Sequence, residues 1–286
     1  MPHQPVTTIA SALDWARTLL RDTSESHMLD ARLLLGEVLQ VKQAYLLQVP
    51  ERTLTVQQSA SYQELVGLRA QGKPLAYLLG KQMFFDIEVF VSPDVLIPRP
   101  ETELLVEKVI AYAKGRGMTI VDVGAGSGVI ALALAKHLPT AQITGIDLSS
   151  GALDVARCNA EHLELEERIR WLRGNLLQPL LDSGETADVI VANLPYIPTE
   201  EMQKLDVSKH EPILALDGGP DGLDIIRRFL ENAPRVLREK GLVIMEIGSG
   251  QGEAVRKLAE AAFPETTVRV ELDLAGHERI VSIERS

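Results

Sequence analysis

The alternation of strand-like and helical patterns after residue 119 most restricts the folds open to this chain of 286 residues. Short apolar runs predict strands at 119–123, 141–147, 168–173, 187–192 and 242–247. Helical spacing of apolar residues predicts helices at 128–137, 150–163, 223–237 and 252–262. Apolar strands separated by helices indicate a mainly parallel, doubly wound α/β sheet covered on both faces. Two closing strands, at 267–272 and 279–283, have no helix between them and should pair antiparallel, which makes the sheet mixed.

Residues 1–84 show helical spacing without strand patterns and predict a small, all-helical N-terminal domain. Thr7 and Thr8 can cap its first helix, and amphipathic helices are expected at 30–39 and 56–69.

Strand-like alternation replaces the helical spacing in residues 85–98, which we interpret as a hairpin linking two domains. The Pro-rich segment that follows, with Thr102 as a possible helix cap, begins a second domain at 99–286.

Composition narrows the classes of partner. A formal net charge of −11 opposes broad charge-driven association with nucleic acid and favours a protein or small-molecule substrate, or a basic partner. The single cysteine, Cys158, excludes an intrachain disulfide and fits a reducing cytoplasm. The N-terminus lacks the pattern of a signal peptide, and no apolar run approaches the ~18 residues of a membrane span. No metal-ligand spacing is found among His137, His162 and His210, so we expect no metal site. Together with the single cysteine and the lack of a membrane span, this leads us to expect a cytoplasmic protein without a membrane partner.

A glycine loop joins the first predicted strand of the second domain to its helix. It consists of Gly124, Ala125, Gly126, Ser127 and Gly128. Glycines permit a tight turn and let a ligand approach the backbone N–H groups, while the helix N-terminus favours a carboxylate or phosphate. The loop is therefore a candidate cofactor site.

The spacing of the loop argues against a dinucleotide fingerprint, because its third glycine comes one residue early. A loop of this form preceded by Asp122 resembles that of the class I methyltransferases, which use S-adenosylmethionine. Asp147, at the end of the second strand, is placed to accept hydrogen bonds from both ribose hydroxyls. Asn175, followed by Leu176, stands where that family usually has an acidic residue contacting adenine, and its carbonyl could still accept from the adenine amine.

The four residues Asn193, Leu194, Pro195 and Tyr196, here called the acceptor turn, follow the apolar strand 187–192. An Asn at a buried strand end, followed by a Pro-stiffened turn and a Tyr, can hold a planar NH2 group. The Asn side-chain carbonyl and the next backbone carbonyl would accept its two hydrogens, and the Tyr ring would cover its face. Because ligands of doubly wound sheets bind beyond the carboxyl ends of the strands, the turn should face the glycine loop, Asp147 and Asn175 across one cleft. This combination is typical of methyl transfer to a planar nitrogen: adenine N6, guanine N2 or glutamine N5.

Several further segments extend the resemblance over nearly the whole chain. These are 95–103 in the linker region, Glu211-Pro212, the run 215–224 and the late segment 246–251. Together with the acceptor turn they resemble the bacterial peptide chain release factor N5-glutamine methyltransferases. That resemblance implies a class I, Rossmann-like methyltransferase fold, S-adenosylmethionine as methyl donor with S-adenosylhomocysteine as product, and release factors as protein substrates.

The resemblance also implies how the site works. A glutamine from a Gly-Gly-Gln loop would enter the cleft, where Asn193 Oδ1 and the Leu194 carbonyl accept its amide hydrogens while Tyr196 packs on the amide plane. Leu194 departs from the family, which usually has proline there. A leucine still supplies the backbone carbonyl, so we expect activity to survive. The helical N-terminal domain is expected to help dock the protein substrate.

Three other functions remain open at this point. An amino-methyltransferase acting on a flipped nucleic acid base would share the chemistry, although the acidic composition argues against it. A methyltransferase of a ribosomal protein glutamine would usually carry a Pro-Arg-Ser-Pro motif, whereas this chain has Pro98-Arg99-Pro100-Glu101. A cofactor-binding adaptor without activity would not need Asn193 and Tyr196.

Overall fold

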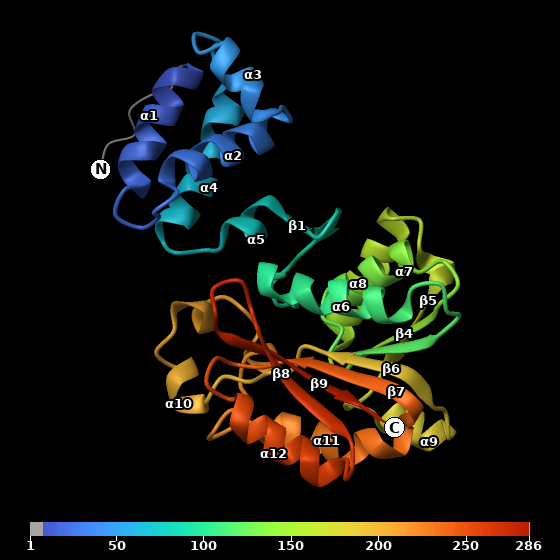
Figure 1. Ribbon diagram of the computed structural model, residues 1–286. Coiled ribbons are helices and arrows are strands. Elements are labelled where there is room, and N and C mark those ends of the chain that lie inside the picture. The colour runs from blue at the N-terminus through green and yellow to red at the C-terminus, as the bar shows by residue number, and fades with distance from the viewer. Residues whose placement is uncertain (1–7, 286) are drawn as a thin grey trace. The chain divides into compact units, whose positions relative to one another are not determined.

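A boundary between Gly80 and Lys81 divides the chain into two compact units. The computed structural model describes residues 8–285 (Figure 1). The boundary lies before residue 84, where the sequence led us to end the helical domain. Gly80 has a φ of 70° and ends the last helix of the first unit, and the chain continues as the strand β1 (Lys81–Phe84). Only Phe84 of this strand is buried. The four residues do not alternate between buried and exposed positions, and the sequence pattern that would have identified a strand is therefore missing.

The described part of the first unit consists of helices packed around one apolar core. They are α1 (Ile9–Leu20), α2 (His27–Leu39), α3 (Gln43–Gln48), α4 (Val56–Ala70) and α5 (Leu75–Leu79). Thr8 and Ser11 form a reciprocal capping box that begins α1, while Thr7 lies outside the described residues. Tyr62 is fully buried in the core, and its hydroxyl donates to the Ala31 carbonyl at 3.0 Å.

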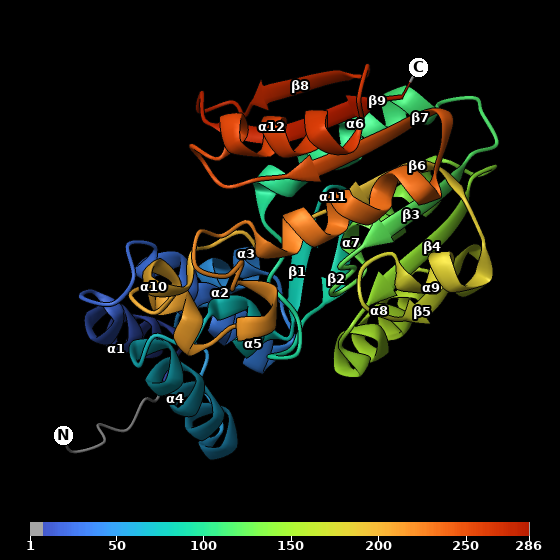
Figure 2. The same cartoon turned by 90° about the horizontal axis from the view of Figure 1, so that it is seen from below.

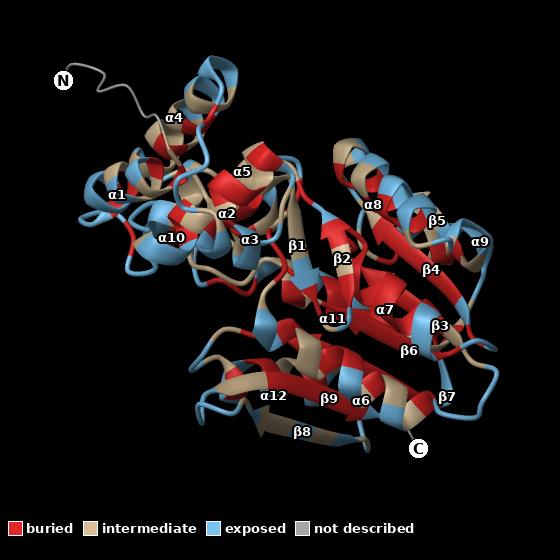
Figure 3. Cartoon of the chain, turned by 90° about the horizontal axis from the view of Figure 1, so that it is seen from above, coloured by how far each residue is buried: buried red, intermediate tan, exposed pale blue. Residues whose placement is uncertain are grey.

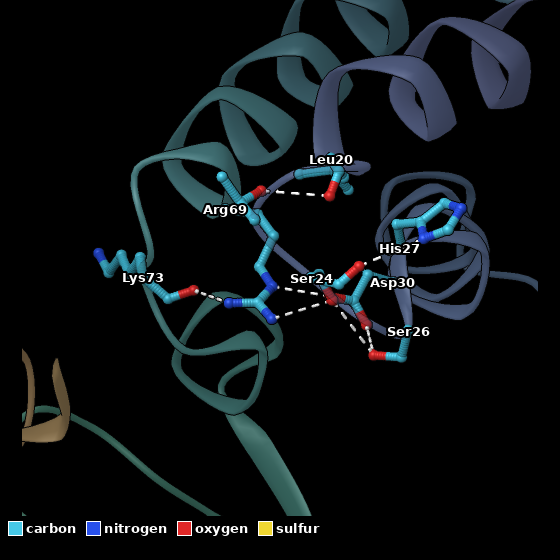
Figure 4. A network of polar contacts seen from close by, with 8 residues as sticks. Leu20, Ser24, Ser26, His27, Asp30, Arg69 and Lys73 are labelled. Carbon is cyan, nitrogen blue, oxygen red and sulfur yellow. Dashed lines mark hydrogen bonds and ion pairs between the residues drawn. The ribbon is translucent and has the colours of Figure 1, made fainter.

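A buried ion pair ties the start of α2 to the end of α4 (Figure 4). Arg69 Nε donates to Asp30 Oδ2 at 2.7 Å, and the hydroxyls of Ser24 and Ser26 donate to the two carboxylate oxygens at 2.8 Å. Arg69 also donates to the Lys73 carbonyl at 3.2 Å. Because each carboxylate oxygen of Asp30 is bonded, the charge is paired although the residue is 1% exposed.

The second unit contains a seven-stranded sheet in the order β5-β4-β3-β6-β7-β9-β8. The strands are β3 (Thr119–Val123), β4 (Gln142–Asp147), β5 (Ile169–Arg173), β6 (Ala187–Ala192), β7 (Leu237–Glu246), β8 (Thr267–Leu272) and β9 (Glu278–Glu284). Strands β3 to β7 pair in parallel, whereas β9 is antiparallel to both β7 and β8. The predicted mixed, doubly wound sheet with an antiparallel closing pair is confirmed.

Helices cover both faces of this sheet (Figures 1 and 2). One face carries α6 (Glu103–Ala113), α7 (Val129–His137) and α8 (Ser150–His162); the other carries α9 (Gln178–Ser183), α11 (Asp224–Val236) and α12 (Gly252–Ala262). The middle strands are buried along most of their length, whereas the edge strand β8 is only half-buried (Figure 3). No helix within residues 8–285 is long and apolar enough to cross a membrane.

Two short segments of the second unit differ from the sequence-based expectation. The linker hairpin is formed by β1 and β2 (Ile87–Phe90), so its first strand precedes residue 85. Strand β7 begins at Leu237, before the predicted residue 242, and an irregularity in its pairing with β6 accompanies the positive φ of Lys240. The apolar pattern did not predict this part of the strand, because residues 238–240 are charged and exposed. Only Leu237 and the residues from 241 onward are buried.

Candidate functional site

A cavity of about 260 Å³ lies at the carboxyl ends of β3, β4, β5 and β6. Strand order reverses between β3 and β6, which is where doubly wound sheets bind ligands. The strand ends contribute Gly124–Ser127, Asp147–Ser149, Gly174–Leu176 and Asn193–Pro195, and two further segments contribute residues from 94–102 and 212–228. The cavity is formed entirely by the second unit.

The glycine loop is held by backbone hydrogen bonds against the end of β4. The N–H groups of Gly124 and Ala125 both donate to the Ile146 carbonyl, at 2.9 and 3.0 Å. Gly124 has a φ of 76°, and a Cβ there would lie 3.3 Å from Leu194 Cδ2 and 3.4 Å from the Asn193 carbonyl oxygen. A glycine is therefore required where the loop passes the acceptor turn.

Asp147 lies between the glycine loop and the start of α8. Its Oδ2 accepts from the Gly126 N–H and its Oδ1 from the Ser149 N–H, both at 2.8 Å. An ionised carboxylate has about four acceptor positions, so each oxygen keeps a further one for a ligand hydroxyl. The side chain thus orders the loop and also faces the cavity.

Asn175 and Leu176 line the same cavity, but Gly128, which we also expected at the cofactor, does not. Gly128 has a φ of 84° and begins α7 behind the loop, where a Cβ would clash with Trp171. Its requirement for glycine therefore comes from the left-handed backbone conformation and from packing.

The acceptor turn is backed by a buried chain of hydrogen bonds. Asn193 Nδ2 donates to Thr102 Oγ1 at 3.0 Å, and Thr102 Oγ1 donates to Glu246 Oε2 at 2.7 Å. The Tyr196 hydroxyl donates to the other oxygen, Glu246 Oε1, at 3.1 Å. Within residues 8–285, neither Asn193 Oδ1 nor the Leu194 carbonyl accepts a hydrogen bond, and both residues line the cavity. Tyr196 does not line it, because its side chain points to Glu246.

Burial perturbs the acid–base properties of this region. Desolvation raises the pKa of Glu246, which is 2% exposed, although hydrogen bonds from Thr102 and Tyr196 and the charge of Arg279 act in the opposite direction. Burial, reinforced by the nearby Glu246, raises the pKa of the Tyr196 hydroxyl. Asp122, fully buried in β3 behind the loop, has its pKa raised to about 7, chiefly by desolvation.

A second buried carboxylate anchors the segment that forms one wall. Glu211 accepts from the Ile97 N–H at 3.0 Å and forms an ion pair with Arg99 at 2.5 Å. This contact joins the linker motif at Pro98 and Arg99 to the Glu211-Pro212 motif, which the sequence suggested only by resemblance. Arg99 and Pro212 both line the cavity.

Sequence reasoning missed Thr102 as a member of the site. We expected its side chain to cap α6, but no such capping bond is present, and its hydroxyl is used between Asn193 and Glu246. Glu246 is the last residue of β7, and the sequence predicted a strand there and a family motif from 246 to 251, but no contact with the acceptor turn. A buried acid at the end of a central strand was the one signal that could have suggested a polar partner there.

Comparison with known proteins decides the family. Residues 11–80 match the PrmC N-terminal domain, and residues 120–207 match a methyltransferase domain. The release factor glutamine methyltransferase of Bacillus anthracis is 36% identical over 282 residues, 96% of this chain and 99% of that protein. That of Moorella thermoacetica is 42% identical over 275 residues, 95% of this chain and 96% of that protein. The chain belongs to the release factor glutamine methyltransferase family.

Solved structures support the fold of this family member. A ribosomal protein L11 methylase from Lactobacillus delbrueckii subsp. bulgaricus aligns with a TM-score of 0.51 at 20% identity, over 72% of this chain and 90% of that chain. The T. thermophilus 16S rRNA N2 G1207 methyltransferase, in complex with AdoMet and guanosine, aligns with a TM-score of 0.53 at 19% identity, over 72% of this chain and 50% of that chain. The second unit therefore has a class I methyltransferase fold.

Proposed function

We propose that this family member transfers a methyl group from S-adenosylmethionine to the side-chain amide nitrogen of the glutamine in the Gly-Gly-Gln loop of a peptide chain release factor. The observation that carries the proposal is the orientation of Asn193. Its Nδ2 is bonded to Thr102 at 3.0 Å, which leaves Oδ1 as an acceptor in the same cavity as the glycine loop and Asp147. The full-length match to relatives named release factor glutamine methyltransferase supports the choice of substrate.

The residues at the ends of β3 to β5 suit S-adenosylmethionine. Asp147 has acceptor capacity for a ribose diol, Leu148 and Leu176 offer apolar walls for adenine beside Asn175, and the glycine loop leads to the N-terminus of α7 for a carboxylate. S-adenosylmethionine would supply a methyl group bonded to a sulfonium sulfur, which keeps the bonding pair and becomes the thioether of S-adenosylhomocysteine. Within residues 8–285 no cluster of three or more metal-ligating side chains occurs.

Asn193 and Leu194 would activate the acceptor by holding its NH2 group. An amide nitrogen is a weak nucleophile, since resonance gives its C–N bond partial double-bond character. Asn193 Oδ1 and the Leu194 carbonyl would each accept one amide hydrogen and stabilise the positive charge that develops on nitrogen. The methylated nitrogen would then lose a proton to solvent, which leaves a neutral N-methyl amide. Pro195 would keep Leu194 extended so that its carbonyl stays in place, and Tyr196, which does not line the cavity, would act through its hydrogen bond to Glu246.

We propose further that the helical unit helps to hold the release factor and that the reaction takes place in the cytoplasm, where release factors act. Met28 and Leu29 are half-exposed at the start of α2 and provide a test of the first point. Replacing both by Ser should raise KM for an intact release factor and leave kcat on a short Gly-Gly-Gln peptide unchanged. Equal effects on both substrates, or none on either, would refute this role.

Mass spectrometry tests the proposed reaction directly. The chain is incubated with S-adenosylmethionine and a release factor, and the tryptic peptide carrying Gly-Gly-Gln should gain one methyl group on the glutamine side chain. A release factor with Gln replaced by Asn is the control and should gain none. Labelling of nucleic acid, or of ribosomal proteins in place of the release factor, would overturn the proposed substrate.

A further inference from the structure

The hydrogen-bond chain behind Asn193 has a direction that the chemistry of its members imposes. An ionised carboxylate can only accept hydrogen bonds. While Glu246 is ionised, the Thr102 hydroxyl must therefore donate its single proton to Glu246 Oε2, 2.7 Å away. Its lone pairs are left to accept from Asn193, so the group 3.0 Å away is the Asn193 NH2 and not its carbonyl. The direction is transmitted from Glu246 through Thr102 to Asn193.

We propose that Glu246 and Thr102 are positioning residues, which set the polarity of the acceptor site by keeping Asn193 Oδ1 turned towards the substrate amide. This inference rests on the proposed function. Without the two residues, the Asn193 side-chain amide could flip by about 180°, because its oxygen and nitrogen ends have nearly the same shape. A reversed amide would present donors to the donors of the substrate NH2 group, and the site would lose its acceptor.

The surroundings of Glu246 hold the carboxylate in one orientation. Its Oε1 accepts from the Tyr196 hydroxyl at 3.1 Å, so both oxygens are bonded. The backbone of Tyr196 is held independently, because Gln251 Nε2 donates to its carbonyl at 2.9 Å while Gln251 Oε1 accepts from the Gly248 N–H. Thr102 and Glu246 are 3% and 2% exposed, so water competes little for the hydrogen bond between them. Tyr196 thus fixes Glu246 from one side and Thr102 transmits its direction from the other.

Protonation of Glu246 should reverse this arrangement. A protonated carboxyl can donate to Thr102, which would free the Thr102 proton to bond the Asn193 carbonyl. Burial raises the pKa of Glu246, and the charged or titratable groups facing it are Tyr196, Glu101 and Arg279. Because the active form is the carboxylate, kcat at saturating cofactor should fall as the pH drops through the pKa of Glu246.

Thr102→Val gives the first test, since it removes the hydroxyl but keeps the shape of the side chain. We expect kcat to fall roughly tenfold or more, on the scale of losing one oriented hydrogen bond, with KM and the affinity for S-adenosylhomocysteine changed less than about twofold. Thr102→Ser should restore most of kcat. Thr199→Val is the matched control, because Thr199 also donates to a carboxylate at 2.7 Å, that of Asp217, and does not line the cavity. Its kcat should stay at the wild-type value.

Glu246→Gln separates charge from direction. A glutamine can still turn its carbonyl towards Thr102 and its NH2 towards Tyr196, so we expect a smaller loss of kcat than in Thr102→Val. The fall of kcat at low pH should disappear, however, whereas Glu101→Gln should retain it. An unchanged acid limb in Glu246→Gln would overturn the role of the carboxylate.

Coupling to Asn193 completes the test, because a residue that acts through Asn193 has nothing to orient once that side chain is removed. In single-turnover measurements, Thr102→Val should have no further effect in an Asn193→Ala background. Suppose that Thr102→Val lowers the single-turnover rate by the same factor in that background as in the wild type, or lowers it in neither. The positioning role is then wrong, while the acceptor site stands. If Asn193→Ala alone turns over at the wild-type rate, the acceptor site of the proposed function is wrong as well.

Discussion

The glycine loop and the acceptor turn lie next to each other, yet they are held by different kinds of interaction. The loop is ordered by backbone N–H groups that bond to Ile146 and Asp147, the last residues of the neighbouring strand. The acceptor turn is ordered by side chains, since Asn193 depends on Thr102, and Thr102 on Glu246. A substitution at Thr102 or Glu246 should therefore alter the acceptor turn and leave the loop unchanged, whereas the loop depends on the side chain of Asp147.

The contrast extends to what each region must do. The loop and Asp147 would bind a ligand that already carries its reactive group, so geometry and a few acceptors suffice. The acceptor turn would have to make a weak nucleophile reactive, which requires an acceptor of known polarity at one place. The buried Thr102–Glu246 bond can maintain that polarity, because a hydrogen bond is electrostatically stronger in the protein interior than in water.

The largest expected effect separates the two regions. Asn193→Ala should lower methyl transfer by at least ~10²-fold, the scale of removing one preorganised partner of a transition state. Affinity for S-adenosylhomocysteine, measured by isothermal titration, should change little because the loop and Asp147 remain. A comparable loss of cofactor affinity would show that the two regions are one binding unit.

The converse change should act on the cofactor side first. Asp147→Ala removes an acceptor for the ligand and the partner of the Gly126 N–H, bonded at 2.8 Å. We expect S-adenosylhomocysteine to bind about 10- to 100-fold more weakly, the scale of losing a hydrogen bond to a charged group. Asp147→Asn, which keeps the shape and one acceptor, should bind with intermediate affinity. Unchanged binding by Asp147→Ala would contradict the ribose role.

The strand behind the loop contains the buried acid Asp122, which should lower the stability of the fold when it is ionised. Its folded-state pKa of about 7 lies above the ordinary value of 3.8. The native state therefore binds more protons than the unfolded state in this window, and the contribution of Asp122 is fully present below about pH 4 and lost as the pH rises through 7. In urea unfolding without cofactor, the free energy of unfolding of Asp122→Asn should rise relative to that of the wild type. The expected rise is roughly 1 kcal/mol for each unit by which the pH increases between these limits. A stability difference that is independent of pH would show that the acid is not protonated in the fold.

The smallest effect is expected at Leu194, where the family resemblance led us to expect proline. The Leu194 side chain is 3% exposed and belongs to the core cluster of the sheet, so it contributes packing that proline would reduce. Leu194→Pro gains about 0.4–1 kcal/mol from a stiffer unfolded chain and loses about 0.8 kcal/mol for each buried CH2 group that the smaller ring lacks. Thermal unfolding and kcat should both remain close to the wild type. A large fall in kcat would mean that the carbonyl position depends on leucine.

Contiguous motifs explain which parts of the molecule could be predicted from sequence. Asp147 ends an apolar strand, and the glycine loop and the acceptor turn each follow one directly; parallel strands bring their carboxyl ends to one edge. Boundaries were less accurate where polar residues form structure, as in β1 and the start of β7. Pairing with β2 and β6, rather than an apolar pattern of their own, identifies these segments as strands.

The sequence by itself determined the α/β fold, the type of cofactor loop and the family, because each depends on residues that are close along the chain. Only the tertiary structure decided which groups stand behind Asn193. Thr102 and Asn193 are 91 positions apart, and Thr102 and Glu246 are 144 apart. Their contact follows from the register of β6 and β7 and from the path of the segment before α6, which no local pattern encodes. A Thr that resembles a helix cap and an acid that ends a strand thus become parts of the acceptor site through packing alone.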